Sequence, residues 1–133
     1  ESVKNRVTII PKISFNKLPE YLSIADIIVI PQRRTSDSIG QIPARLFDAM
    51  SMARPILTTR VSDIPEVLGD CGYLIEPNEP SQLADSIEYI LSHPDEAYKK
   101  GQAARKKCKE MYDMSNLESS LKELIERVVV GKG

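Results

Sequence analysis

The sequence predicts an α/β protein whose parallel, doubly wound sheet is covered by helices. Short apolar runs alternate along the chain with segments of helical period. The run at 26–31 is apolar almost throughout and ends at a proline, as expected of a strand buried on both faces. The chain has 133 residues, which is enough for the core of one domain.

The first part of the chain predicts two strands and a helix. The run VTII predicts a strand at 7–10 that ends before Pro11. Residues 16–25 repeat their apolar side chains at helical spacing, so we expect a helix there. The second strand, 26–31, leads into a polar loop at 32–42.

The middle of the chain continues the alternation. We expect a helix at 43–53, because its apolar residues fall on one side. PILTT at 55–59 predicts the next strand, and a short helix at 63–68 follows with Ser62 or Asp63 as its N-cap.

The last part of the chain is mostly helical. A fourth strand is expected at 72–76, and it is followed by helices at 81–93 and 94–112. A final helix is expected at 117–129 with Asn116 as its cap.

The predicted strands are too few for an independent doubly wound sheet. The chain also begins at Glu1 and not at a methionine, so we expect residues 1–133 to be part of a larger nucleotide-binding half. With the earlier strands absent, a gap would separate 7–10 from 26–31. Unpaired strand edges invite partners, so this fragment is expected to dimerise or rearrange.

Composition excludes several classes of function. The 18 basic and 19 acidic residues give a net charge of −1, so no nucleic-acid partner is expected. Cys71, Cys108 and His93 have no metal-ligand spacing and cannot form a catalytic triad, so we expect no metal and no cofactor. No apolar run approaches the ~18 residues that span a bilayer. We therefore expect a cytoplasmic protein, or one that is peripheral at a membrane surface.

The loop at 32–42 is the candidate binding loop. Ligands of open α/β sheets bind beyond the carboxyl ends of the strands, and a long loop there is usually functional. Pro43 opens the following helix, and free backbone N–H groups at 40–44 together with the helix dipole would favour a phosphate.

The same helix carries polar residues whose purpose the spacing leaves open. Gln41, Arg45 and Asp48 share one side of the helix. Arg45 and Asp48 could form a surface ion pair. Alternatively, Asp48 could point at a ligand, since a carboxylate accepts the two hydrogen bonds that a ribose diol donates.

The order of motifs resembles the C-terminal half of the group 1 (family 4) glycosyltransferases. The resemblance is carried by three segments: LPEYLSIADIIVIPQ, GQIPARLFDAMSMARPILTT and VSDIPEVLGDCGYLIEPNEPSQLADSIEYIL. It implies a GT-B architecture of two Rossmann-like halves around a cleft. The C-terminal half of such an enzyme holds the nucleotide-sugar donor, and a hexosyl group passes to an acceptor glycan, lipid or small molecule. This chain would then be an incomplete C-terminal half, inactive alone because the acceptor half is absent.

The resemblance also implies donor-binding residues. Asp48 takes the position of the acid that binds the donor ribose, and the segment around Lys12 and Ile13 corresponds to the one that meets the base. The segment entering the helix would approach the diphosphate and the donor sugar; it comprises Gly40, Gln41, Ile42, Pro43, Ala44 and Arg45. The family's first acid falls on Gly40, which has no side chain, so the sugar contact is missing. No catalytic residue is assigned.

Two other functions stay open beside the transferase. A degenerate transferase half could serve as a non-catalytic binding or assembly module, which the missing acid at Gly40 favours. A GT-B sugar-nucleotide epimerase would share the fold and the ligand, but such enzymes rely on histidine and carboxylate pairs that this chain lacks.

Overall fold

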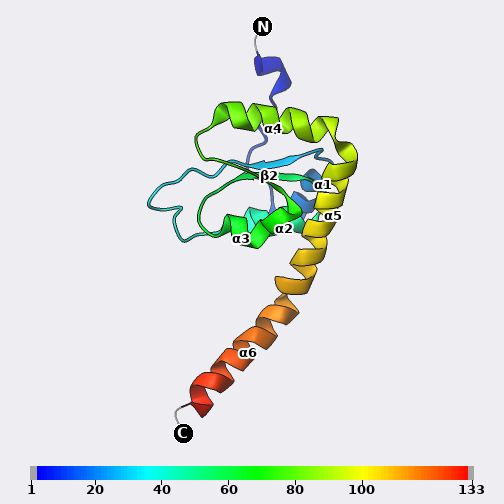
Figure 1. Cartoon of the computed structure of the whole chain (residues 1–133). Helices are drawn as coiled ribbons and strands as arrows, with labels where there is room; N and C mark the ends of the chain where they lie inside the picture. The colour runs from blue at the N-terminus through cyan, green and yellow to red at the C-terminus, as the bar shows by residue number, and fades with distance from the viewer. Residues whose placement is uncertain (1–2, 132–133) are drawn as a thin grey trace.

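The fold is a small parallel sheet between helices (Figure 1), seen in a computed structural model that describes residues 3–131. The elements are, in order, η1 (Val3–Arg6), η2 (Phe15–Lys17), α1 (Leu18–Ser23), β1 (Ile28–Ile30), α2 (Ala44–Ser51), β2 (Ile56–Thr59), α3 (Ile64–Leu68), η3 (Gly69–Cys71), β3 (Tyr73–Ile75), α4 (Pro80–Ser92), α5 (Pro94–Met111) and α6 (Met114–Val130).

The sheet has three strands in the order β1-β2-β3, and both pairings are parallel. Ile28 pairs with Ile56, and Leu57 pairs with Tyr73. This confirms the predicted α/β class and three of the predicted strands. Because the strands are parallel, their carboxyl ends meet at one edge of the sheet.

Helices cover both faces of the sheet, as Figure 1 shows with α4 on one side and α2 and α3 on the other. Cores of buried apolar residues fill both interfaces. One joins β1 and β2 to α2, α3 and α5 and includes Leu46, Met50 and Ile56. The second joins β2 and β3 to α4 and α5 and is centred on Leu57 and Ile90. The central strand β2 is therefore buried on both faces, whereas β1 does not meet that prediction, because its Val29 is 37% exposed.

The predicted strand at 7–10 does not form. Residues 7–10 have no regular secondary structure, and Ile9 is 87% exposed. A strand needs a neighbour for its backbone groups, and among residues 3–131 β1 pairs only with β2. The prediction of a strand here is thus wrong, and 7–10 is an exposed segment outside the sheet.

The last helix begins earlier than predicted. α6 starts at Met114, and its N-cap is Asp113, whose carboxylate accepts the N–H of Met114. Asn116 is not the cap, because its amide donates to the carbonyls of Lys109 and Glu110 at the end of α5. Figure 1 shows α6 leading away from the sheet, and none of its side chains is buried.

Candidate functional site

The loop between β1 and α2 folds around one buried serine. The Ser38 hydroxyl lies 2.6 Å from the carbonyl oxygen of Arg33, to which it donates. It also accepts the N–H of Thr35 at 2.8 Å. The first half of the loop is therefore a closed turn that does not depend on a ligand.

The second half of the loop is fastened to the segment after β2. Gly40 has a φ of 83°, in the left-handed region that favours glycine. Its N–H donates to the hydroxyl oxygen of Ser62 at 3.0 Å. Gln41 donates its N–H to the carbonyl of Ser38 at 3.3 Å.

These bonds correct the expectation of free N–H groups throughout 40–44. The N–H groups of Gly40 and Gln41 already have acceptors, and Pro43 has none to offer. Among residues 3–131, Ile42 and Ala44 keep N–H groups that no protein atom accepts.

Pro43 is the N-cap of α2 and not its first helical residue. Its ψ of 127° is extended, so the helix begins at Ala44. No side chain caps the first turn of α2, which leaves the positive end of the helix dipole facing solvent. Arg45 is exposed in that turn. The start of α2 can therefore attract an anion, although fewer N–H groups are available than the sequence predicts.

Asp48 lies beside the N-terminal helices. It is half-buried and lines a cleft of about 40 Å³ together with Phe15, Leu18 and other residues of η2, α1 and α2. The alternative of an Arg45–Asp48 ion pair is wrong, since the ion pairs among residues 3–131 do not include it.

Cys108 of α5 lies next to the part of α2 that carries Asp48. Its thiol donates to the carbonyl of Phe47 at 3.8 Å. Burial raises the pKa of the Cys108 thiol, and the carboxylates of Asp113 and Asp48 raise it further. The thiol is therefore neutral near pH 7 and adds no negative charge beside Asp48.

Lys12 and Ile13 precede this cleft in the chain. Lys12 is exposed and Ile13 is half-buried, in a segment without regular secondary structure. Phe15, which follows closely, shares the cleft with Asp48. No hydrogen bond or ion pair within residues 3–131 joins Lys12 or Ile13 to 40–45, so the structure connects these two parts of the predicted site only through Phe15 and Asp48.

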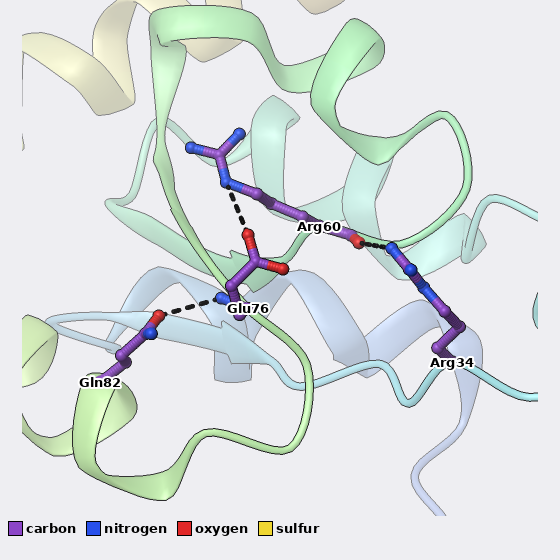
Figure 2. Close-up of polar contacts among 4 residues, drawn as sticks. All are labelled: Arg34, Arg60, Glu76 and Gln82. Carbon is purple, nitrogen blue, oxygen red and sulfur yellow. Dashed lines mark hydrogen bonds and ion pairs between the residues drawn. The ribbon is translucent and has the colours of Figure 1, made fainter.

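A chain of polar contacts crosses the carboxyl ends of all three strands (Figure 2). Arg34 donates to the carbonyl of Arg60 at 3.2 Å, and the Arg60 guanidinium pairs with Glu76 at 3.5 Å. The N–H of Glu76 donates to the side chain of Gln82 on α4 at 3.1 Å. These contacts join the binding loop to the β2 loop (residues 60–63) and to the β3 loop (residues 76–79).

Sequence reasoning missed these contacts. The signal that could have found them is the polar end of the β2 run, where Thr58 and Thr59 are buried. Thr58 donates to the carbonyl of Ile30 at 2.9 Å, and Thr59 donates to that of Gln32 at 2.6 Å. The Thr58 hydroxyl therefore fixes the end of β1 to β2, and the Thr59 hydroxyl fixes the start of the binding loop to β2.

A cleft of about 230 Å³ lies at the same edge of the sheet. Its lining includes Gln32 and Arg33 from the binding loop, Thr59 at the end of β2, and Glu76 and Asn78 after β3. The cleft thus brings the guanidinium group of Arg33 together with the carboxylates of Glu76 and Glu79 in a largely apolar hollow, so it offers polar groups of both signs.

Two features are absent from the described part of the chain. Within residues 3–131, no group of His, Cys, Asp and Glu side chains could hold a metal ion. In the same range no helix has the length and apolar character needed to cross a membrane.

The fold defines a class of protein: α/β domains with an open parallel sheet, in which ligands bind beyond the carboxyl ends of the strands. Residues 1–93 match the family described as "Glycosyl transferases group 1". The chain belongs to that family.

Individual relatives agree with the family. Alpha-D-kanosaminyltransferase of Streptomyces kanamyceticus is 25% identical over 95 residues, which cover 70% of this chain and 23% of that protein. Sucrose-phosphate synthase of Thermosynechococcus elongatus superposes with a TM-score of 0.82 at 21% identity, covering 96% of this chain and 31% of that one. Anabaena HepE, solved in complex with UDP, gives a TM-score of 0.75 at 15% identity over 82% of this chain and 29% of its own.

These likenesses confirm the predicted fold. The chain has the Rossmann-like layering of part of a GT-B glycosyltransferase. It spans about a quarter to a third of the length of these relatives.

Proposed function

We propose that this chain supplies part of the donor site of a glycosyltransferase that uses a nucleotide-sugar. Family membership supports the reaction class, and Anabaena HepE has been solved with UDP and with UDP-glucose. The observation that carries the proposal is the uncapped start of α2, which follows a fixed loop and has Asp48 further along the same helix.

In the proposed site, each part of the segment has a separate task. The N–H groups of Ile42 and Ala44 and the guanidinium of Arg45 would face the diphosphate. Asp48 would accept hydrogen bonds from the ribose hydroxyls. Lys12 and Ile13 would meet the base, and Gly40, Gln41 and Pro43 would line the path to the donor sugar.

The proposed reaction is the transfer of a hexosyl group. An acceptor hydroxyl forms a new bond to the anomeric carbon, while the bond from that carbon to the diphosphate oxygen breaks. The nucleoside diphosphate leaves with the bonding electron pair, and the acceptor proton passes to a base. The start of α2 stabilises the charge that develops on the leaving group. No metal or cofactor is proposed.

The wider setting is proposed on the same basis. Residues 1–133 would be an incomplete C-terminal donor domain, and another part of the full-length protein would bind the acceptor glycan, lipid or small molecule. We place the protein in the cytoplasm or at a membrane surface, without a nucleic-acid partner.

The isolated chain is proposed to self-associate. The exposed segment 7–10 and the outer edge of β1 leave backbone groups available to a second copy. Size-exclusion chromatography with light scattering should report a species larger than 14.9 kDa. A clean monomer in which 7–10 is protected from hydrogen exchange would contradict this.

Titration calorimetry tests the donor site. The full-length protein is titrated with UDP, GDP and ADP, alongside Asp48→Ala and the control Asp85→Ala, which removes an exposed acid from α4. We expect Asp48→Ala to weaken the best diphosphate about 10-fold or more, because charge-assisted hydrogen bonds are lost. Asp85→Ala should bind like the unchanged protein, and undiminished affinity in Asp48→Ala would remove Asp48 from the site.

A non-catalytic binding module is the second candidate, and Gly40 is the observation that favours it. Full-length protein that binds a nucleoside diphosphate, but neither transfers nor hydrolyses any sugar from a panel of nucleotide-sugars, would support the module over the enzyme.

A further inference from the structure

The space beside Gly40 is open, and the Ser62 hydroxyl bonds the backbone of this glycine. A Cβ built on Gly40 would meet no atom within 4 Å. The Ser62 oxygen accepts the N–H of the same glycine at 3.0 Å. A polar group from the β2 loop (residues 60–63) is therefore bonded to the backbone of residue 40, which itself offers no side chain.

The Ser62 hydroxyl still has a proton to donate. Its only hydrogen bond within residues 3–131 is the one that it accepts from Gly40, and the residue is half-buried. A hydroxyl carries one donor besides its acceptor lone pairs, and accepting a bond strengthens it as a donor. The hydroxyl is thus prepared to bind an oxygen atom of a ligand.

The backbone holds Ser62 in a costly conformation. Its φ of 52° lies in the left-handed region, where residues other than glycine are uncommon and strained. Glycine would satisfy this backbone more easily, but it would remove the hydroxyl.

The surrounding loop is fixed, so the hydroxyl has a definite position. The N–H of Arg60 donates to the carbonyl of Ile75 at 2.8 Å, and the Arg60 side chain pairs with Glu76. Arg34, which lies in the binding loop, donates a hydrogen bond to the Arg60 carbonyl, as Figure 2 shows. Such support is what a binding group needs for specificity.

We propose that Ser62 is a specificity-determining residue that donates its hydroxyl proton to an oxygen atom of the donor's sugar. It would supply, from the β2 loop, the polar contact that Gly40 cannot make. The inference rests on the proposed function. It predicts that Ser62 contributes more to binding of the nucleotide-sugar than to binding of the free nucleoside diphosphate.

The test compares two ligand classes in one protein. Full-length protein is titrated with UDP, GDP and ADP and with the glucose and mannose conjugates of each diphosphate that binds. Ser62→Gly removes the hydroxyl while keeping the left-handed backbone unstrained. Ser120→Gly, which alters an exposed serine of α6 outside the binding loop, is the control.

We expect Ser62→Gly to weaken the best nucleotide-sugar about 3- to 10-fold more than the free diphosphate, as for loss of one neutral hydrogen bond, because loss of the bond to the Gly40 N–H affects both ligands alike. Ser62→Ala should show the same selective loss at lower thermal stability, because alanine keeps the strain. Ser120→Gly should change the affinity for neither ligand.

Other results overturn the inference in distinguishable ways. Equal weakening of both ligands would mean that Ser62 only holds the loop. Undiminished affinity for the nucleotide-sugar, or a wild-type protein that binds a diphosphate but none of its sugar conjugates, would reject the sugar contact alone. If no diphosphate binds the wild-type protein, the proposed function fails and this inference fails with it.

Discussion

Gly101 of α5 packs directly against the backbone of Ala53, at the end of α2. A Cβ on Gly101 would lie 2.4 Å from the Ala53 carbonyl oxygen and 2.9 Å from its carbonyl carbon. Backbone atoms cannot rotate away as a side chain can. The close approach of α2 and α5, which supports the helix that carries Asp48, therefore depends on the glycine.

Gly101→Ala should destabilise the chain by about 1–3 kcal/mol, since overpacking forces the backbone to shift. Urea unfolding followed by circular dichroism measures the change. Gly131→Ala, at the exposed end of α6, is the control, and the new Cβ there lies 3.0 Å from the Arg127 carbonyl oxygen. A Gly101→Ala variant with an unchanged midpoint would show that the helices are not in this contact.

Ala53→Gly should stabilise the chain. Ala53 has a φ of 56°, and the left-handed conformation costs a residue with a Cβ about 1–2 kcal/mol. Glycine removes this cost but adds about 0.4–1 kcal/mol of unfolded-chain entropy, so we expect a net gain of about 1 kcal/mol. A higher unfolding midpoint at constant slope would confirm it, whereas a lower midpoint would show that the alanine methyl contributes packing that outweighs the strain.

The sequence predicted those strands whose partners lie within the chain. The runs at 26–31, 55–59 and 72–76 became β1, β2 and β3, because each has a neighbour to satisfy its backbone. The run VTII at 7–10 has an equally strong apolar pattern but remains outside the sheet. Local pattern reports what a segment can form, while pairing depends on which segments are present.

The candidate site was predictable in its location but not in its contacts. The loop before α2 and the position of Asp48 follow from periodicity and from the motif order. The bond between Gly40 and Ser62 joins residues 22 positions apart, and no local propensity encodes it. That tertiary bond changes which N–H groups remain for a ligand.

Ser38→Ala should loosen the binding loop. Ser38 is buried, and its loss leaves the carbonyl of Arg33 and the N–H of Thr35 without their partner. We expect a cost of about 1–3 kcal/mol confined to the loop. Hydrogen exchange at Thr35 and Ile39 should accelerate while β2 stays protected. Unchanged exchange at Thr35 would mean that the loop is held by other contacts, and Ser36→Ala should leave it unaltered.

The link between α4 and α5 should make stability depend on acid pH. Glu96 accepts hydrogen bonds from Tyr89 at 2.9 Å and from Tyr73 at 3.2 Å. The Tyr89 bond holds the pKa of the Glu96 carboxyl below its ordinary value of 4.5, and the Tyr73 bond, Lys100 and His93 lower it further. A lowered pKa gives stability that is present above the ordinary pKa and is lost as pH falls through the folded value. Glu96→Gln should flatten this acid loss in unfolding midpoints measured from pH 6 to about 3, and an equal loss in both proteins would exclude Glu96.

Tyr73 should make stability depend on alkaline pH. Its effect is opposite in direction to that of Glu96, because the stability is lost as pH rises. Burial and the bond to Glu96 raise the pKa of Tyr73 from 10.0 to about 12. A raised pKa gives stability that is fully present below the unfolded value and disappears as pH rises through the folded one, so the window runs from about pH 10 to 12. The measurement is the difference in stability between wild type and Tyr73→Phe, in which contributions that the two proteins share cancel. We expect wild type to be more stable at pH 9 and to lose its advantage toward pH 12, because the ionised phenol can no longer donate to the Glu96 carboxylate. A difference that stays constant with pH would mean that the Tyr73 hydroxyl does not bond Glu96 in solution.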